Sequence, residues 1–240
     1  MDKESKLDAL FIGAHPDDIE LTSAGTLLKL VKNGYKCGII DLTLGELSTG
    51  GTPSQRQSET KKATKILGIK VRENLCLPDG DIQCNQKNRI RLIRLLRKYK
   101  PEVVFAPYPY DRHPDHINAS NLIRESVYFS GLAKIKIDET TPYRPKRIFY
   151  FSHAYDIPVS FIIDITDTFK TKVKSIKAYS SQFYKPGIKK QYKTYINSKL
   201  FLKSIETKAR FYGFKIGVEY GEPFFSPEPL NIEISNLLKL

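Results

Sequence analysis

The chain has 240 residues, with 39 Lys and Arg against 26 Asp and Glu, so its formal net charge is +13 with neutral histidines. Hydrophobic residues make up 40% and charged residues 27% of the chain, which is typical of a soluble globular protein and excludes a disordered tail or a fibre. The longest stretch without a charged side chain, residues 47–55, is polar and rich in glycine, so the sequence predicts no membrane span. Residues 1–6 are mostly charged and precede a strand-like run without an apolar signal-peptide region, so we expect a cytoplasmic location.

The cysteines and the distribution of charge exclude some classes of protein and leave others open. Cys37, Cys76 and Cys84 are odd in number and form no CxxC pair, which indicates reduced thiols rather than a disulfide framework or a cysteine zinc site. Residues 170–215 contain 13 Lys and Arg and one acidic residue, Glu206, so this segment carries +12 of the net charge. Such a basic face attracts any anion, whether a nucleic acid, a membrane surface or a small polyacid substrate.

Strand-like and helix-like patterns alternate along the chain. Short apolar runs predict strands at residues 7–13, 35–44, 71–77, 102–106, 147–151 and 159–165. Apolar residues at helical spacing, with capping residues and Gly or Pro stops, predict helices at 23–33, from Ser54 to Gly68, from Asn85 to Pro101, at 167–180 and at 198–211. This alternation predicts an α/β protein with a mostly parallel sheet that helices cover on both faces. We find no internal repeat or domain linker, so we expect residues 1–240 to form a single domain, in which 181–197 is a loop over the active site.

Imidazoles and carboxylates gather directly after the first and the fourth predicted strand. The first strand is followed by the loop 14–20, with the sequence AHPDDIE, and the fourth by the loop 107–116, which ends in HPDH. Three of the 4 histidines of the chain lie in these two loops. Because ligands bind beyond the carboxyl ends of parallel strands, we expect both loops at one edge of the sheet, around a common site.

The residues of the two loops fit a catalytic metal centre. Zinc in such a centre typically takes three ligands of the His and carboxylate type and leaves a fourth position for water. His15 and Asp18 from the first loop and His116 from the second can supply these ligands for one zinc ion per chain, although iron or cobalt would accept the same atoms. Either loop alone is as typical of a turn or a helix start as of a site, and only their combination favours the metal.

The same loops contain the groups that a hydrolysis needs. Asp17 lies beside the expected ligands, where it can take a proton from metal-bound water as a general base. His113 can stabilise the oxyanion that forms from a carbonyl group. Asp115 is close in sequence to His113, and we expect it to orient that ring through a hydrogen bond and to keep it protonated.

Three further features have less specific interpretations. His153 is a single histidine after a strand, and a structural role with satisfied hydrogen bonds is the more common outcome for such a residue. The segment 45–52 has two adjacent glycines but not the spacing of a phosphate loop, and we expect a flexible rim of the site. Arg56 follows this rim and either binds a substrate carboxylate or belongs to a solvated helix face, two alternatives that charge alone does not separate.

The two motifs resemble those of the LmbE-like (PIG-L) zinc-dependent de-N-acetylases, which act on N-acetylglucosamine conjugates. The family pattern of AHPDDxE after the first strand and HPDH after the fourth matches residues 14–20 and 113–116 in full. Residues 45–52 with Arg56, and the later segment 216–224, are similar to the branch that deacetylates N-acetylglucosaminyl malate in bacillithiol biosynthesis. The resemblance extends over nearly the whole chain.

This resemblance implies a Rossmann-like sheet, a zinc-dependent hydrolase, and a homo-oligomer, either a trimer or a hexamer. For the two loops it implies His15, Asp18 and His116 as zinc ligands, Asp17 as general base, and His113 as the group that stabilises the oxyanion and assists departure of the amine. It also implies a substrate-binding arginine, which matches Arg56, and an oxyanion-side tyrosine in the later loop. For that tyrosine Tyr195 is our choice and Tyr192 is the alternative.

The expected reaction is hydrolysis of an acetamide on a small anionic sugar conjugate, with acetate and a free amine as products. Malate would add two carboxylates to the substrate, and a basic rim with Arg56 gives an electrostatic reason for this aglycone. The alternatives among enzymes are deacetylation of another conjugate, such as an inositol glycoside or a chitooligosaccharide, and an amidase acting on a thiol conjugate. A nucleic-acid or anionic-polymer binder is the alternative from another class, because tyrosines are interleaved with the lysines of 170–215, but no nucleic-acid motif accompanies them. We therefore expect neither a nucleic acid nor a membrane as the partner.

Overall fold

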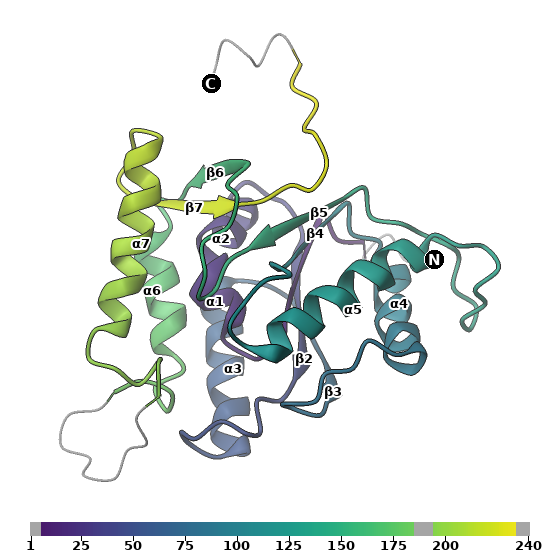
Figure 1. Cartoon of the computed structure of the whole chain (residues 1–240), viewed down its shortest axis with the longest axis horizontal. Helices are drawn as coiled ribbons and strands as arrows, with labels where there is room; N and C mark the ends of the chain where they lie inside the picture. The colour runs from purple at the N-terminus through teal and green to yellow at the C-terminus, as the bar shows by residue number, and fades with distance from the viewer. Residues whose placement is uncertain (1–5, 185–193, 234–240) are drawn as a thin grey trace.

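A computed structural model describes residues 6–184 and 194–233 of the chain (Figure 1). Its strands are β1 (Ala9–Gly13), β2 (Cys37–Thr43), β3 (Val71–Leu77), β4 (Val103–Pro107), β5 (Arg147–Phe151), β6 (Phe161–Asp164) and β7 (Gly221–Phe224). Its helices are α1 (Asp18–Thr22), α2 (Ala24–Lys32), α3 (Pro53–Leu67), α4 (Gln86–Tyr99), α5 (Pro114–Ser130), α6 (Phe169–Lys177) and α7 (Phe201–Lys215). The predicted strands at 71–77 and 147–151 have these bounds, and the other predicted elements differ only at their ends.

Five parallel strands form the central sheet, in the order β3-β2-β1-β4-β5. On one face, Leu10 of β1 belongs to a buried cluster with Leu92 of α4 and Leu122 of α5. On the other face, the neighbouring Phe11 belongs to a cluster with Leu27 of α2 and Leu67 of α3. Successive side chains of a strand point to opposite faces, so two apolar neighbours indicate a strand that is covered on both sides. The predicted α/β fold, with a parallel sheet between two layers of helices, is confirmed (Figure 1).

A second, two-stranded antiparallel sheet pairs β6 with β7. The sequence predicted β6 but not its partner, because the two strands are far apart in the chain and β7 is short. The ring of Phe224 in β7 packs against Phe105 of β4 with centroids 5.2 Å apart. Glu222, also in β7, accepts the backbone N–H groups of Gly25 and Thr26 at 2.9 and 2.7 Å, at the start of α2. The small sheet therefore ties the C-terminal part of the chain to the side of the central sheet that α2 covers.

The helices begin at capping residues that the sequence identified only in part. Asn85 caps α4 as predicted, because its side-chain oxygen accepts the backbone N–H of Asn88 at 2.9 Å. The predicted start of α3 at Ser54 is wrong, since Thr52 is the cap and Pro53 is the first helical residue, a position that proline favours. Among the helices of the described ranges, none is both long and apolar enough to cross a membrane.

Candidate active site

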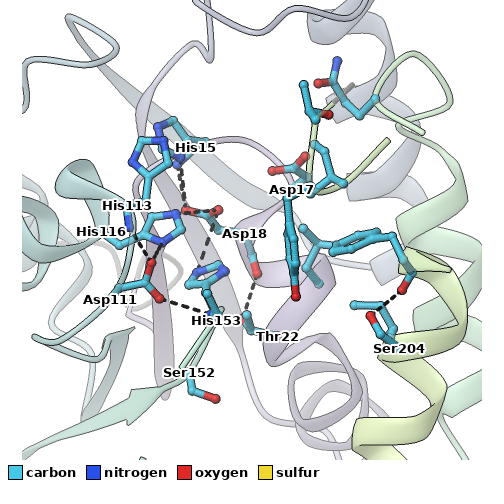
Figure 2. Close-up of a pocket in the computed structure, with 18 of the residues that line it drawn as sticks. His15, Asp17, Asp18, Thr22, Asp111, His113, His116, Ser152, His153 and Ser204 are labelled. Atoms are coloured by element: carbon cyan, nitrogen blue, oxygen red, sulfur yellow. Dashed lines mark hydrogen bonds and ion pairs between the residues drawn. The ribbon is translucent and has the colours of Figure 1, made fainter. Parts of the chain in front are cut away.

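The carboxyl ends of all five parallel strands lie at one edge of the central sheet, and the loops that follow them line a cleft (Figure 2). The cleft has a volume of about 1210 Å³. Its walls include both His-Pro-Asp loops, the Gly-rich rim 45–52 and part of α7. The two loops thus lie together at the sheet edge where the sequence placed them.

The three predicted metal ligands come together in this cleft. Nδ1 of His15 lies 3.7 Å from Oδ2 of Asp18, and Nε2 of His116 lies 3.5 Å from Oδ1 of the same carboxylate. One ligand atom from each of the three residues lies within 4.8 Å of the others. A Cβ at Gly13 would lie 2.9 Å from the Cβ of Asp18, so the tight turn after β1 requires glycine. The sequence therefore brings one carboxylate between two imidazoles from different loops.

Each of the two histidines has its other ring nitrogen on a carboxylate. Nε2 of His15 lies 3.1 Å from Oδ1 of Asp79 and 3.2 Å from Oδ2 of Asp115. Nδ1 of His116 lies 3.0 Å from Oδ1 of Asp111. Histidines that bind metal ions show this pattern, because the outer carboxylate fixes the tautomer and turns the free nitrogen toward the ion. The chemistry of this donor set fits a divalent cation.

Asp79 and Asp111 belong to the site, although sequence reasoning did not select them. Asp79 follows β3, whose carboxyl end lies at the same edge as those of β1 and β4. The rule that located the two loops would have found this residue if it had been applied to the third strand. Asp111 lies inside the second loop, where Oδ1 also accepts the backbone N–H of His113 at 2.8 Å. One carboxylate therefore holds both histidines of that loop.

Asp115 holds a different histidine from the one that the sequence predicted. Its carboxylate accepts the backbone N–H groups of Gly80 and Ile82, at 2.7 and 3.3 Å, and it faces His15 rather than His113. Asp115 lies in the first turn of α5, so its backbone N–H, not its carboxylate, meets Nδ1 of His113, at 3.2 Å. Burial and the nearby charge of His15 lower the pKa of His113, which opposes the expected protonation of this ring.

Asp17 and Arg56 form a buried ion pair beside the predicted ligands. Nη2 of Arg56 lies 3.3 Å from Oδ2 of Asp17, and the two residues are 6% and 4% exposed. The backbone of Asp17 has a φ of 111°, a strained value for a residue with a Cβ, and such strain is concentrated at functional sites. Burial raises the pKa of Asp17 to about 7, although the charge of Arg56 opposes this shift.

The guanidinium of Arg56 faces the cleft and is only partly paired. It is buried, which excludes the alternative of a solvated helix face. Nε and Nη1 are buried with no hydrogen-bond partner in the described part of the chain. The guanidinium lies over the ring of Tyr179, 5.5 Å from its centroid, which fixes the direction of the side chain. Arg56 therefore keeps two guanidinium nitrogens unpaired beside the cleft.

His153 lies against the predicted ligands, and the prediction of a structural role with satisfied hydrogen bonds is wrong (Figure 2). Its side chain is 10% exposed, and Nε2 is buried with no hydrogen-bond partner among the residues that the structure describes. Nε2 lies 3.8 Å from Oδ1 of Asp18, and the ring stacks on that of His116 with centroids 4.0 Å apart. Burial and the charge of His116 lower the pKa of His153 to about 3, so the ring is neutral near pH 7.

The later loop lines the cleft with residues from both sides of the gap at 185–193. Tyr195 is 52% exposed, and the guanidinium of Arg112 lies over its ring, 4.6 Å from the centroid. Tyr192 lies outside the described residues. The predicted active-site loop at 181–197, and the choice between the two tyrosines, therefore stay predictions.

Comparison with known proteins gives consistent matches. A family model described as PIG-L: GlcNAc-PI de-N-acetylase matches residues 10–127, a range that contains both loops of the site. The chain is 30% identical over 189 residues to diacetylchitobiose deacetylase of Thermococcus kodakarensis, covering 72% of this chain and 69% of that protein. It is 26% identical over 193 residues to probable N-acetyl-alpha-D-glucosaminyl L-malate deacetylase 2 of Bacillus anthracis, covering 72% and 80% of the two chains. The crystal structure of the conserved protein TT1542 from Thermus thermophilus matches with a TM-score of 0.86 and 36% identity, covering 95% and 97%.

Proposed function

We propose a substrate for this chain, which belongs to the PIG-L family of deacetylases and hydrolyses the N-acetyl amide of a GlcNAc-type substrate. We infer that this substrate is N-acetylglucosaminyl malate, so that the enzyme would serve bacillithiol biosynthesis. The observation that carries the proposal is the buried guanidinium of Arg56, in which two nitrogens have no hydrogen-bond partner in the described residues. The similarity to the relative from Bacillus anthracis, whose name includes this malate conjugate, supports the same substrate.

The donor set of the cleft supports a divalent cation, and zinc is our choice. His15, Asp18 and His116 would hold it, because their inner nitrogen and oxygen atoms converge while the outer ring nitrogens are held by carboxylates. When bound, the cation would polarise the acetyl carbonyl and lower the pKa of a water molecule. Iron or cobalt would accept the same ligands.

Asp17 and His113 would move the protons of the reaction. Asp17 lies next to a predicted ligand in the chain, and its carboxylate would take a proton from the attacking water. Nδ1 of His113 accepts a backbone N–H, so the neutral ring carries its proton on Nε2. From Nε2 the ring would donate a hydrogen bond to the developing oxyanion and so assist departure of the amine, which would take up the proton that Asp17 removed from the water. Asp115 would contribute by orienting His15 and the backbone that meets His113.

Arg56 would bind a carboxylate of the malate moiety. A guanidinium N–H donates a charge-assisted hydrogen bond to a carboxylate, and a buried donor without a partner gains most from such a ligand. Further basic side chains line the same cleft and raise its positive potential, namely Arg112, Lys203 and Lys208. Part of the +12 segment therefore lies beside the site, where it would attract an anionic conjugate.

The proposal is tested by comparing kcat/KM for the malate conjugate with kcat/KM for the uncharged methyl glycoside of N-acetylglucosamine. We expect the malate conjugate to be preferred by about 10-fold to 100-fold, because hydrogen bonds to charged groups contribute about 1.5–3 kcal/mol. Arg56→Gln should remove this preference. Arg56 also pairs with Asp17, so the methyl glycoside is the control for damage to the general base. Equal specificity constants in the wild-type enzyme would reject malate and leave deacetylation intact.

Diacetylchitobiose is the second candidate substrate, because the Thermococcus relative with 30% identity is named for it. This substrate is neutral and would leave the unpaired donors of Arg56 without a carboxylate. A higher kcat/KM for diacetylchitobiose than for the malate conjugate would decide in its favour.

We further propose that the enzyme is a homotrimer or homohexamer, on the basis of the family resemblance. The C-terminal part of α7 and the residue after it expose apolar side chains, with Phe211, Phe214 and Ile216 at 54%, 84% and 42% exposure. Such clustered apolar exposure is typical of a protein interface. Light scattering of the purified protein distinguishes a trimer, a hexamer and a monomer directly.

A further inference from the structure

We infer that Gln182 is a positioning residue, which holds the Gly-rich rim 45–52 as a fixed wall of the cleft. The two adjacent glycines of this rim predict a flexible segment, whereas in the structure the rim is hydrogen-bonded to Gln182. Gln182 follows α6 and lines the same cleft as the rim. The inference rests on this cleft as the substrate site of the proposed function, but neither on malate nor on a bound metal.

The side-chain amide of Gln182 contacts the rim through both of its polar atoms. Its Oε1 accepts the hydroxyl of Ser48 at 2.7 Å, and its Nε2 donates to the backbone oxygen of Gly50 at 2.8 Å. The residue is 5% exposed, so water competes little for these hydrogen bonds. A buried amide whose two ends are both paired makes the segments that it joins rigid.

Glu59 of α3 holds the residue that precedes Gln182. One carboxylate oxygen of Glu59 accepts the backbone N–H of Ser181 at 2.8 Å, and the other accepts the hydroxyl of Ser181 at 2.7 Å. Glu59 is buried and belongs to the same helix as Arg56. The segment that contains Gln182 is therefore fixed to α3 without help from the rim, so it can serve as an anchor for the rim.

The adjacent glycines of the rim allow close packing against this anchor. A Cβ at Gly50 would collide with the backbone oxygen of Ser181, and a Cβ at Gly51 would lie 2.7 Å from the Cβ of Ser181. Gly51 also has a φ of 75°, in the left-handed region that glycine adopts without strain. Both glycines are thus required by the contact between two segments, and they are not evidence of a flexible rim.

The other end of the rim packs against side chains of the candidate site. A Cβ at Gly45 would lie 3.3 Å from Nη2 of Arg56, so the rim backbone lies directly against the guanidinium. The backbone N–H of Leu47 donates to Oδ2 of Asp79 at 2.8 Å, and the other oxygen of this carboxylate faces a predicted ligand. The rim therefore extends from the anchor at Gln182 to groups of the site, and a fixed rim would keep the substrate pocket formed before the substrate binds.

A positioning role and a merely structural role of Gln182 have different kinetic consequences. If Gln182 holds the rim, its loss would leave the pocket formed in only a fraction of the molecules. The apparent dissociation constant of the substrate would then rise by the inverse of that fraction, whereas the bound complex would react at its usual rate. A merely structural amide would change the stability of the fold and leave KM unchanged.

The inference is tested with Gln182→Met, which keeps the length of the side chain and loses both contacts with the rim. The matched control is Asn88→Leu, which removes another buried amide, one that donates to the backbone oxygen of Gln83 from α4. With the methyl glycoside of N-acetylglucosamine as substrate, we expect KM to rise at least about 5-fold in Gln182→Met while kcat stays within about 2-fold. Both constants should stay near the wild-type values in Asn88→Leu.

NMR order parameters of the backbone amides of residues 48–51 give a second measurement, which needs no substrate. We expect about 0.85 in the wild-type protein and less than about 0.6 in Gln182→Met, the values of rigid and of flexible backbone. Values below about 0.6 in the wild type would overturn the inference, whatever the folding of the variant.

The inference would also be overturned if Gln182→Met kept the order parameters of the wild type, or if Asn88→Leu raised KM by the same factor. In the first case Gln182 would not hold the rim, and in the second the change in KM would follow from lost stability alone. Failure to prefer the malate conjugate would reject only the proposed substrate, because these measurements use an uncharged glycoside or no substrate at all.

Discussion

Two of the buried ion pairs in this protein differ in how fully they are hydrogen-bonded. In the first, Nζ of Lys172 lies 2.6 Å from Oε1 of Glu222, and both side chains are 3% exposed. Oε1 also accepts the backbone N–H of Gly25, Oε2 accepts the backbone N–H and the hydroxyl of Thr26, and Nζ donates to the backbone oxygen of Thr22. This pair joins α6, β7 and α2, and its charges are satisfied by the protein alone.

The second pair, Asp17 with Arg56, is buried to a similar extent but is not saturated. Two guanidinium nitrogens of Arg56 have no partner in the described ranges, and Asp17 is held in a strained backbone conformation. Burial of charge is therefore common to a structural pair and to a pair at the active site. The unpaired donors are what indicates a ligand.

The largest effect on activity is expected from a substitution of Asp17, the acidic member of the second pair. In Asp17→Asn the side chain keeps its size but can no longer accept a proton at neutral pH, so kcat should fall by about 100-fold to 10,000-fold. Metal content should remain close to that of the wild type, because no predicted ligand is lost, whereas the melting temperature should fall, because the buried guanidinium of Arg56 loses its carboxylate partner. Normal turnover by this variant would show that Asp17 is not the base.

Breaking the first pair should lower the stability of the protein rather than its catalytic activity. Lys172→Met leaves the buried carboxylate of Glu222 without its cation, and we expect the free energy of unfolding to fall by about 3–5 kcal/mol in denaturant titration. The matched control is Lys6→Met, which removes the 53% exposed partner of Glu102 and should change stability least of all these variants. Equal losses in the two variants would contradict the assignment of Lys172 to a structural pair.

The parts of the site that the sequence predicted are those that directly follow a strand and share a motif. His15, Asp17 and Asp18 follow β1, and His113 and His116 follow β4, so the rule for parallel sheets was enough to bring them together. The central sheet was predictable for the same reason, since its apolar runs alternate with capped helices. The strand β7 was not, because it is short and its pairing with β6 depends on a distant segment.

The parts that the sequence missed depend on which strands are neighbours and on which way a side chain turns. His153 follows β5, and only the strand order shows that β5 lies beside β4 and brings this histidine to His116. Asp79 reaches His15 because β3 ends at the same edge. Proximity in sequence suggested that Asp115 binds His113, whereas the first turn of α5 directs its carboxylate to His15.

The central claim is that two distant loops form one metal cage, and zinc binding by two single-site variants tests it most directly. We predict one zinc ion per chain in the wild-type protein, measured by metal analysis after dialysis. His15→Ala, which alters the first loop, and His116→Ala, which alters the second, should each lose the bound ion. If either variant retained one zinc ion with wild-type affinity, the two loops would not share a metal site.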